Sequence, residues 1–226
     1  MTDASTSEAV APTAVMLRIT EIFHSIQGEA DAVGWPTVFV RLTGCPLRCS
    51  WCDTTYSFHG GNKRSLEDVL ASVAAFNTRH VCVTGGEPLA QRACLVLLSA
   101  LCDAGHEVSL ETSGAMDVSG VDARVRKVLD LKCPGSGEHL RNRYENLPLL
   151  SPADQIKFVI ADRADYLWAR EQCQTRGLPA LCQVLFSPVA EVLPAPTLVD
   201  WILADRMPVR FQLQLHKVLW GNVAGR

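Results

Sequence analysis

The chain has 226 residues, a formal net charge of −3 and 48% hydrophobic residues. This length most simply makes one domain with a sizeable core, and the charge excludes the broad basic field that nucleic-acid binding needs, so we expect no nucleic-acid partner. No apolar run is long enough to span a bilayer, so we expect no membrane partner either.

The N-terminal region differs in composition from the rest. Residues 1–16 are expected to be a disordered tail and residues 17–226 a single domain. The tail is rich in Ala, Ser and Thr, and lacks the basic start and apolar core of a signal peptide. The chain also has nine cysteines, which without a signal peptide favours a reducing, cytoplasmic location over disulfides. We expect five of them to be packed in the core: Cys82, Cys94, Cys102, Cys173 and Cys182.

Two strands precede the first motif. Leu17–Phe23 alternates polar and apolar residues like a half-buried strand, and His24–Glu29 follows as a polar loop. Thr37–Thr43 predicts a second strand, which delivers the loop Cys45-Pro-Leu-Arg-Cys49-Ser-Trp-Cys52-Asp53-Thr54. Ligand sites in α/β folds gather at the carboxyl ends of strands, so this loop is well placed for chemistry.

The loop carries three cysteines in the spacing C-x3-C-x2-C. Three thiolates can hold three corners of a cubane iron–sulfur cluster, and four are usual. No fourth cysteine is nearby, so one iron is predicted to be open to a ligand. The alternatives are a zinc loop and packed thiols. Structural zinc takes four ligands, often as two pairs, and no second pair is present; three cysteines in one polar loop also fit core packing poorly.

The next segments predict alternating helices and strands. Ser65 is expected to cap a helix to about Asn77, with Asp68 completing a capping box. His80–Thr84 predicts a buried strand that ends at Gly85-Gly86-Glu87-Pro88, and a helix is expected from Pro88 to about Ala104, with Gly105 after it. Further strands are expected at Glu107–Glu111 and Arg126–Leu131.

The stretch from Cys133 to Gln155 lacks the helical period that a crossover helix would show. Strand, helix and strand alternate again after it, and the predicted elements are Ile156–Ile160, Ala164–Arg176, Ala180–Phe186, Thr197–Asp205 and a last strand Val209–Leu215. This alternation predicts an α/β fold with a parallel sheet of about six strands. Six strands do not close an eight-stranded barrel.

The cysteine spacing at the end of an apolar strand, followed by Gly85-Gly86-Glu87-Pro88, resembles the radical S-adenosylmethionine (SAM) superfamily. The resemblance implies a reduced radical SAM core, an incomplete, curved (β/α) barrel. It also implies a [4Fe-4S] cluster on Cys45, Cys49 and Cys52. In that superfamily the open iron binds SAM, and cleavage of SAM makes a 5′-deoxyadenosyl radical.

Segments at both ends narrow the resemblance. Glu21–Glu29, Gly34–Pro36 and Phe39–Arg41, together with Gln214-Leu-His216-Lys217 and Trp220, closely resemble the 7-carboxy-7-deazaguanine synthase family. This implies a carbon–nitrogen lyase of queuosine and other 7-deazapurine biosynthesis. The substrate would be 6-carboxy-5,6,7,8-tetrahydropterin, whose ring contracts with loss of ammonia after hydrogen abstraction at C6, and SAM would be used catalytically. The family also implies Mg2+, a homodimer and a flavodoxin-type reductant.

The family motifs assign candidate ligands to positions of this chain. Thr54 matches the magnesium ligand. Positions matching substrate contacts are Ile26, Gln27, Gly28, Glu29, Arg41, Thr84, His216 and Arg226. Candidate SAM contacts are Trp51, Cys52, Asp53, Gly86, Glu87, Ser113, Asp130, Leu131, Lys132 and Phe186.

The residues themselves support some of these roles. Gln27 can both donate to and accept from a pterin edge, and Glu29 could pair with its guanidine-like N2/N3 edge. Arg41 interrupts an apolar strand, so it should bind either the substrate carboxylate or an acidic protein side chain. Glu111 could bridge the SAM and substrate sites. In family members the C-terminal carboxylate reaches the substrate, whereas here the chain continues through Gly221–Arg226.

Three other functions remain open. A glycyl-radical-enzyme activase is also short, but it needs a protein-docking face and no pterin pocket, and Gln27, Arg41 and the Gln-Leu-His-Lys segment argue against it. An iron–sulfur electron carrier would not need the Gly-Gly-Glu-Pro motif. A zinc-stabilised binding module would not form an iron–sulfur cluster.

Overall fold

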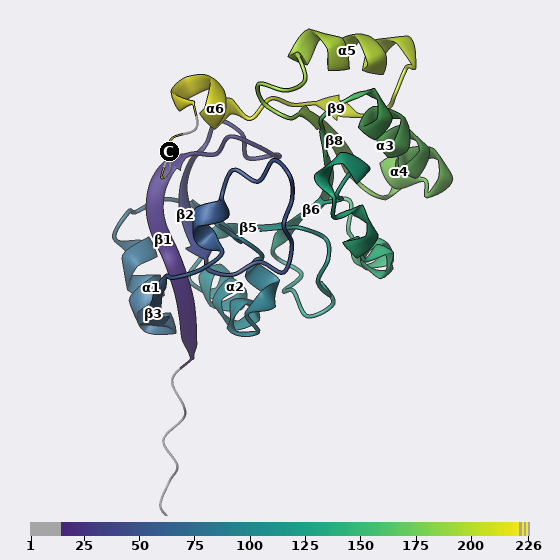
Figure 1. Cartoon of the computed structure of the whole chain (residues 1–226). Helices are drawn as coiled ribbons and strands as arrows, with labels where there is room; N and C mark the ends of the chain where they lie inside the picture. The colour runs from purple at the N-terminus through teal and green to yellow at the C-terminus, as the bar shows by residue number, and fades with distance from the viewer. Residues whose placement is uncertain (1–14, 222, 224, 226) are drawn as a thin grey trace, which may run out of the picture.

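The computed structural model describes residues 15–221, 223 and 225. In this part of the chain nine strands form one sheet in the order β3-β1-β2-β4-β5-β6-β7-β8-β9 (Figure 1). Their bounds are β1 Met16–Ile26, β2 Pro36–Leu42, β3 Asn62–Ser65, β4 His80–Gly85, β5 Glu107–Thr112, β6 Arg126–Asp130, β7 Gln155–Ile160, β8 Gln183–Pro188 and β9 Arg210–Phe211. The strands from β2 to β9 along this order are parallel, and β1 runs antiparallel to β2 and β3. The fold is therefore α/β with a mostly parallel, unclosed sheet, as expected.

Helices lie between the strands. Their bounds are α1 Leu66–Ala74, α2 Ala93–Asp103, α3 Arg163–Thr175, α4 Leu178–Leu181, α5 Ala195–Ala204 and α6 Leu215–Trp220. The Ser65 hydroxyl caps α1 by accepting a hydrogen bond from the Asp68 amide at 3.1 Å, which confirms the predicted cap. Among the described residues, every helix is too short or too polar to cross a bilayer.

The two faces of the sheet have different partners. Val38, Val40 and Leu42 of β2 are fully buried in the core between sheet and helices. Phe39 and Arg41 alternate with them and line a cavity on the concave face. Further along the sheet, Phe158 and Phe186 pack edge to face against each other. Alternate residues of a strand thus face either the apolar core under the helices or the polar cavity on the other side of the sheet.

The stretch from Cys133 to Gln155, which the structure describes throughout, contains short 3-10 turns in place of an α-helix. These are Pro134–Ser136, His139–Arg141 and Tyr144–Leu149. The predicted lack of a crossover helix is therefore confirmed.

The main differences between predicted and observed bounds concern four elements. The first strand begins at Met16 and continues to Ile26, so it takes in part of the expected polar loop; residues 1–14 of the expected tail lie outside the described residues. The helix after Gly85-Gly86-Glu87-Pro88 begins only at Ala93, because the side chain of Gln91 binds the backbone at Arg18 and Thr43. Its Oε1 accepts from the Arg18 backbone amide, and its Nε2 donates to the Arg18 and Thr43 carbonyls. Those contacts hold Gln91 in an extended conformation.

The other two differences are near the C-terminus. The predicted strand Ala180–Phe186 begins at Gln183, because Leu178–Leu181 forms α4 after Gly177. The predicted last strand Val209–Leu215 pairs with β8 only at Arg210 and Phe211. The chain then leaves the sheet and forms α6.

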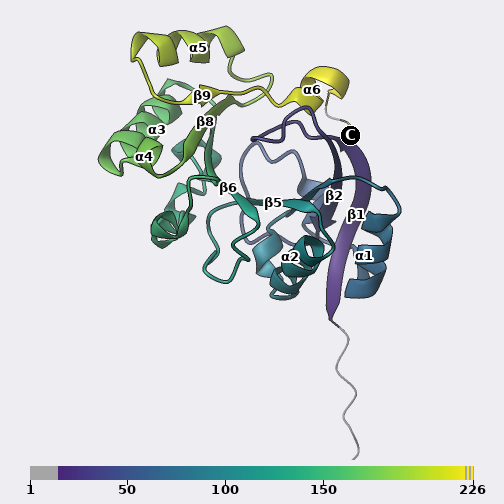
Figure 2. The same cartoon turned by 180° about the vertical axis from the view of Figure 1, so that it is seen from behind.

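The segment after β9 connects the two sides of the open barrel. The Gln212 amide donates to the Phe186 carbonyl of β8 at 3.0 Å, and the Leu215 amide donates to the Gly28 carbonyl just after β1 at 2.9 Å. Seen from behind, α6 lies beside the ends of β1 and β2, away from the helices α3, α4 and α5 (Figure 2). The C-terminal segment thus joins β8 to the loop that follows β1.

Candidate active site

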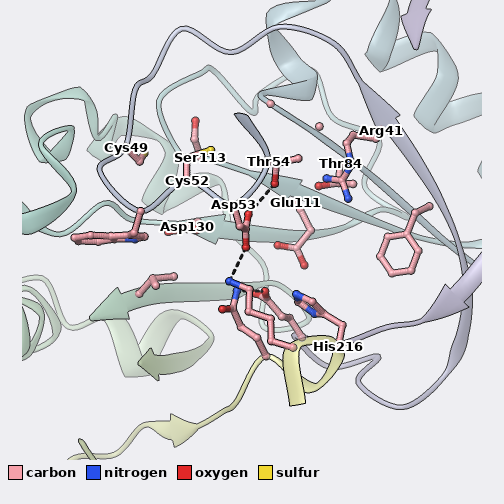
Figure 3. Close-up of a pocket in the computed structure, with 18 of the residues that line it drawn as sticks. Arg41, Cys49, Cys52, Asp53, Thr54, Thr84, Glu111, Ser113, Asp130 and His216 are labelled. Carbon is pink, nitrogen blue, oxygen red and sulfur yellow. Dashed lines mark hydrogen bonds and ion pairs between the residues drawn. The ribbon is translucent and has the colours of Figure 1, made fainter. Parts of the chain in front are cut away.

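A cavity of about 670 Å³ lies on the concave face of the sheet. Most of the predicted site residues line it, which brings positions far apart in the chain to one place (Figure 3). They are Ile26, Gln27, Glu29, Arg41, Cys45, Cys49, Trp51, Cys52, Asp53, Thr54, Thr84, Gly86, Ser113, Asp130, Lys132 and His216. Of the predicted residues that are described, Gly28, Glu87, Leu131 and Phe186 do not line the cavity. Arg226 lies outside the described residues.

The cysteine loop follows β2 and is held against the Gly-Gly-Glu-Pro turn that follows β4. The Glu87 amide donates to the Gly44 carbonyl at 2.8 Å, and the Gly86 amide donates to the Leu42 carbonyl at 3.2 Å. A Cβ at Gly86 would lie 2.4 Å from the Gly44 oxygen and 2.7 Å from the Cys45 Cβ. Glycine is therefore required here so that the two motifs can approach each other.

The other side of the cysteine loop contacts the irregular segment after β6. The Arg48 amide donates to Glu138 Oε1 at 2.6 Å, and the Ser50 amide donates to the Ser136 carbonyl at 3.0 Å. The Arg48 guanidinium donates to the Cys45 and Leu47 carbonyls and lies 4.2 Å from the centre of the Phe58 ring. These contacts fix the loop from both sides.

The three thiols of this loop face the same cavity. Burial raises the pKa of Cys45 and raises that of Cys49 to about 11, so both thiols are protonated in the metal-free protein. A bound metal displaces such protons, because the thiolate is the ligand form. Three thiols from one loop, with open cavity beside them, fit a cubane cluster that keeps one iron available to a further ligand.

A buried lysine organises the polar end of the cavity. Lys157 Nζ lies 2.5 Å from Glu29 Oε2, 3.5 Å from Glu111 Oε2 and 3.6 Å from Asp130 Oδ2. Burial alone lowers the pKa of Lys157, but its three carboxylate neighbours raise it well above the usual value. Burial raises the pKa of Glu111 to about 7. At Glu29 the charge and hydrogen bond of Lys157, together with Gln214 and His216, outweigh burial and lower the pKa. The cavity therefore combines an ionised carboxylate with one that titrates near neutrality.

Sequence reasoning missed Lys157. The available signal was a lysine inside the apolar strand Ile156–Ile160, the same signal that singled out Arg41. It is ambiguous, because Lys127 has a similar setting in β6 and forms a buried ion pair with Asp154 at 3.0 Å. Lys127 does not line the cavity.

Arg41 extends from β2 toward β1. Its Nε donates to Glu21 Oε1 at 2.6 Å, and the Tyr56 hydroxyl donates to the same oxygen at 2.8 Å. The protein pair that the sequence left as an alternative is therefore present, and the same guanidinium also lines the cavity beside Thr84 of β4 (Figure 3).

His216 and Lys217, which directly follow the predicted strand Val209–Leu215, lie on helix α6. Lys217 Nζ pairs with Asp53 Oδ2 at 2.7 Å, and the Thr54 hydroxyl donates to Asp53 Oδ1 at 2.7 Å (Figure 3). Burial opposes ionisation of Asp53, but the charge and hydrogen bond of Lys217, the Thr54 hydrogen bond and the Lys157 charge together outweigh burial and lower the pKa of Asp53 to about 2. Burial lowers the pKa of His216, which favours the neutral imidazole.

Gly28 acts through its small size. A Cβ there would lie 2.1 Å from His216 Nδ1 and 2.9 Å from the His216 backbone nitrogen. Gly28 therefore lets α6 approach the loop after β1. Because His216 lies directly against Gly28, Gly28 itself does not line the cavity.

Three expected SAM contacts are placed elsewhere for physical reasons. Glu87 is fully buried, and its carboxylate accepts hydrogen bonds from Leu89, Thr112 and Ser113. Leu131 faces the core, between Asp130 and Lys132, which face the cavity and pair at 3.0 Å. The Phe186 ring packs on Phe158 and Tyr166, on the outer face of β8.

Known proteins resemble this chain in sequence and fold. The profile of the Radical SAM superfamily matches residues 39–171. The 7-carboxy-7-deazaguanine synthase of Chlorobaculum tepidum is 45% identical over 207 residues, which cover 90% of this chain and 94% of that protein. The chain belongs to the 7-carboxy-7-deazaguanine synthase family. The family member from Koribacter versatilis is 42% identical over 219 residues, which cover 90% and 97% of the two chains.

A solved structure agrees with this membership. The crystal structure of QueE from Escherichia coli matches with a TM-score of 0.72 and 25% identity, over 89% of this chain and 95% of that chain. The predicted superfamily, family and unclosed α/β fold are thereby confirmed. Membership in the 7-carboxy-7-deazaguanine synthase family also implies an iron–sulfur cluster and SAM, which the thiols and cavity described above can accommodate.

Proposed function

We propose that the chain converts 6-carboxy-5,6,7,8-tetrahydropterin to 7-carboxy-7-deazaguanine and ammonia, as a carbon–nitrogen lyase of 7-deazapurine (queuosine) biosynthesis. The observation that carries this proposal is that one cavity joins the three loop cysteines to Gln27, Glu29, Arg41 and His216. A cluster and a polar heterocycle can thus be held next to each other. The names of the relatives support 7-carboxy-7-deazaguanine as the product.

The cysteine loop would hold the cluster, and the backbone at Gly86 would face the methionine part of SAM. When bound, the cluster and SAM supply the radical that takes a hydrogen atom from C6 of the pterin. Asp130 and Lys132 lie on the same side of the cavity as the loop cysteines, since Lys132 influences the pKa of Cys49. They would contact the nucleoside part of SAM, together with Ser113 and the Trp51–Asp53 backbone.

The polar end of the cavity would bind and orient the pterin. Glu29, held ionised by Lys157, is suited to the N2/N3 edge, where a charge-assisted pair fixes the ring in its plane. The Gln27 amide can add a donor and an acceptor. Arg41 and Thr84 would bind the substrate carboxylate, and His216, neutral because it is buried, would accept or donate a single hydrogen bond.

Thr54 would contribute a hydroxyl oxygen to Mg2+. This hydroxyl donates to Asp53 Oδ1, so its lone pairs stay available to a cation, and Thr54 lines the cavity. Hydroxyl, substrate and water oxygens are the hard ligands that Mg2+ prefers. The carboxylate of the substrate held by Arg41 would complete this site.

The proposal extends to the surroundings of the enzyme. All nine cysteines lie in the described part of the chain as free thiols, which suits a reducing cytoplasm. The flavodoxin-type reductant is proposed from the family resemblance. We propose a homodimer on the basis of the family resemblance.

An anaerobic assay tests the reaction. Reconstituted protein is mixed with SAM, dithionite, Mg2+ and 6-carboxy-5,6,7,8-tetrahydropterin, and products are followed by mass spectrometry. We expect 7-carboxy-7-deazaguanine without net loss of SAM, and no product from Cys49→Ala. Cleavage of SAM to 5′-deoxyadenosine with the pterin unchanged would contradict the substrate and favour a glycyl-radical activase.

A further inference from the structure

Ala30, in the loop after β1, has a backbone conformation that alanine disfavours. Its φ is +61°, in the left-handed region, where a Cβ crowds the following carbonyl group. The residue is 4% exposed and packs with Val128 and Leu185 inside the sheet. A buried non-glycine residue keeps this conformation only where its surroundings impose it.

The imposing group is the side chain of Gln212. Its Oε1 accepts from the Ala30 amide at 2.6 Å, and its Nε2 donates to the Ala30 carbonyl at 2.9 Å. Gln212 is itself 6% exposed, and its backbone amide is bonded to the Phe186 carbonyl of β8. One amide therefore satisfies both backbone groups of Ala30 and ties them to the sheet from 182 residues away in sequence.

Glu29, the residue before Ala30, and Gln214, two residues after Gln212, line the cavity. Glu29 pairs with Lys157, and its other oxygen accepts from Gln214 Nε2 at 2.7 Å. The Glu29 amide donates to Gln27 Oε1 at 3.1 Å. If Ala30 relaxed to an extended or helical backbone, the adjoining Glu29 would rotate away from Lys157. The direction in which Glu29 points thus depends on the backbone at Ala30.

We infer that Gln212 is a positioning residue of the substrate site: its amide holds Ala30 in the left-handed conformation and thereby directs Glu29 and Gln27 into the cavity. Its link to the pterin rests on the proposed function, but its effect on the loop does not. An amide is required because only a group that both donates and accepts can serve both Ala30 groups.

The test compares Gln212→Met and Gln212→Glu with wild-type protein. Methionine keeps the approximate shape and removes both hydrogen bonds; glutamate keeps the acceptors and removes the donor. The matched control is Gln172→Met, which removes an equally buried glutamine of α3 that contacts Arg176 outside the cavity. Cluster content and SAM affinity show that each variant is folded.

The first readout is hydrogen–deuterium exchange of the peptide covering residues 27–35, followed by mass spectrometry. We expect faster exchange in both Gln212 variants and wild-type exchange in Gln172→Met. Unchanged exchange in Gln212→Met would overturn the inference, whatever the substrate of the enzyme is. This readout separates a failure of the inference from a failure of the proposed function.

The second readout is the KM for the pterin. We expect it to rise about tenfold or more in Gln212→Met, because two buried backbone groups lose their partners, with SAM affinity unchanged. Ala30→Gly in the Gln212→Met background should recover part of that loss, since glycine adopts positive φ without a Cβ penalty. Faster exchange with wild-type KM, or no recovery by glycine, would overturn the positioning role.

Discussion

Lys217 of α6 forms an ion pair with Asp53 of the cysteine loop, with 2.7 Å between Nζ and Oδ2. The pair joins the C-terminal helix to the loop that carries the cluster ligands. Lys217 follows His216 and Asp53 precedes Thr54, and all four residues line the cavity, so the pair holds one boundary of the substrate site in place.

Replacing Lys217 by Met should loosen this boundary. The Asp53 side chain is 41% exposed, so the pair contributes at most about 1 kcal/mol, and we expect the pterin KM to rise by up to about fivefold. Because salt screens an exposed ion pair, high salt should raise the wild-type KM toward the variant's value and leave the KM of the variant unchanged. Lys63→Met, at an exposed lysine of β3, is the control, and an equal effect there would contradict the assignment.

Alanine at Cys45, Cys49 or Cys52 should abolish cluster assembly. Each thiolate holds one corner, and the described loop offers no fourth cysteine in its place. The measurement is iron and sulfide content with visible absorbance after anaerobic reconstitution. Cys102→Ala, at a half-buried thiol of α2, should retain full iron content. Normal iron content in a Cys49→Ala protein would rule out this ligand set.

Thr54→Ala should raise the Mg2+ concentration needed for half-maximal activity by at least roughly tenfold, because one oxygen ligand is lost. Thr54→Ser keeps the hydroxyl and should behave like wild type. Thr55→Ala, one residue further and exposed, is the matched control. Wild-type magnesium dependence in Thr54→Ala would assign the hydroxyl to loop structure only, as donor to Asp53.

Glu111 should make the unfolding free energy depend on pH. Its pKa is about 7 in the folded protein, raised chiefly by burial, against an ordinary 4.5. The folded state therefore binds more protons than the unfolded state between these values, and the contribution of Glu111 to stability falls as pH rises from about 4.5 to about 7. Above pH 7 the contribution levels off.

Glu111→Gln should remove this loss of stability. The melting temperature of the variant, relative to that of wild type, should therefore rise as the pH increases from about 4.5 to about 7. The comparison uses metal-free protein and thermal unfolding at matched pH values. Glu171→Gln, at an exposed position of α3, should track wild type throughout. A constant difference between Glu111→Gln and wild type from pH 4.5 to 7 would exclude the raised pKa.

Gly28→Ala should inactivate the enzyme. The added methyl would overlap His216 Nδ1 and its backbone nitrogen, so α6 must move away from the cavity. Displacements near 1 Å lower rates by about a hundredfold, which is the loss we expect at minimum. Gly120→Ala is the control, because its Cβ meets only the flexible end of Leu95. A fully active Gly28→Ala enzyme would show that close approach of α6 is dispensable.

Local sequence patterns predicted much of this site. The cysteine spacing, the Gly-Gly-Glu-Pro turn and the strand alternation of β2, β4 and β5 depend on neighbouring residues, and each was placed correctly. The strands deliver Arg41, Thr84 and Glu111 to one face because alternate residues share a face.

The remaining features depend on contacts between distant residues. Lys157 shows its role only beside Glu29, 128 positions earlier. The polar alternation of Val209–Leu215 predicts a strand, but β8 offers pairing at only two residues, and Gln212 turns its amide to Ala30 instead. Gly28 could be assigned to a turn from sequence, and only the position of His216 explains it.

The absence of a crossover helix between Cys133 and Gln155, within the described chain, has a consequence for the cysteine loop. A helix uses the amide and carbonyl groups of its interior residues in its own hydrogen bonds. Irregular backbone leaves such groups available, and the Ser136 carbonyl and the Gly135 carbonyl both accept from Ser50, in the middle of the cysteine loop. The shortened connection therefore provides the backbone carbonyls that bind the cysteine loop. Designing a regular helix into this segment would remove these hydrogen-bond partners and with them the fixed positions of the three thiols.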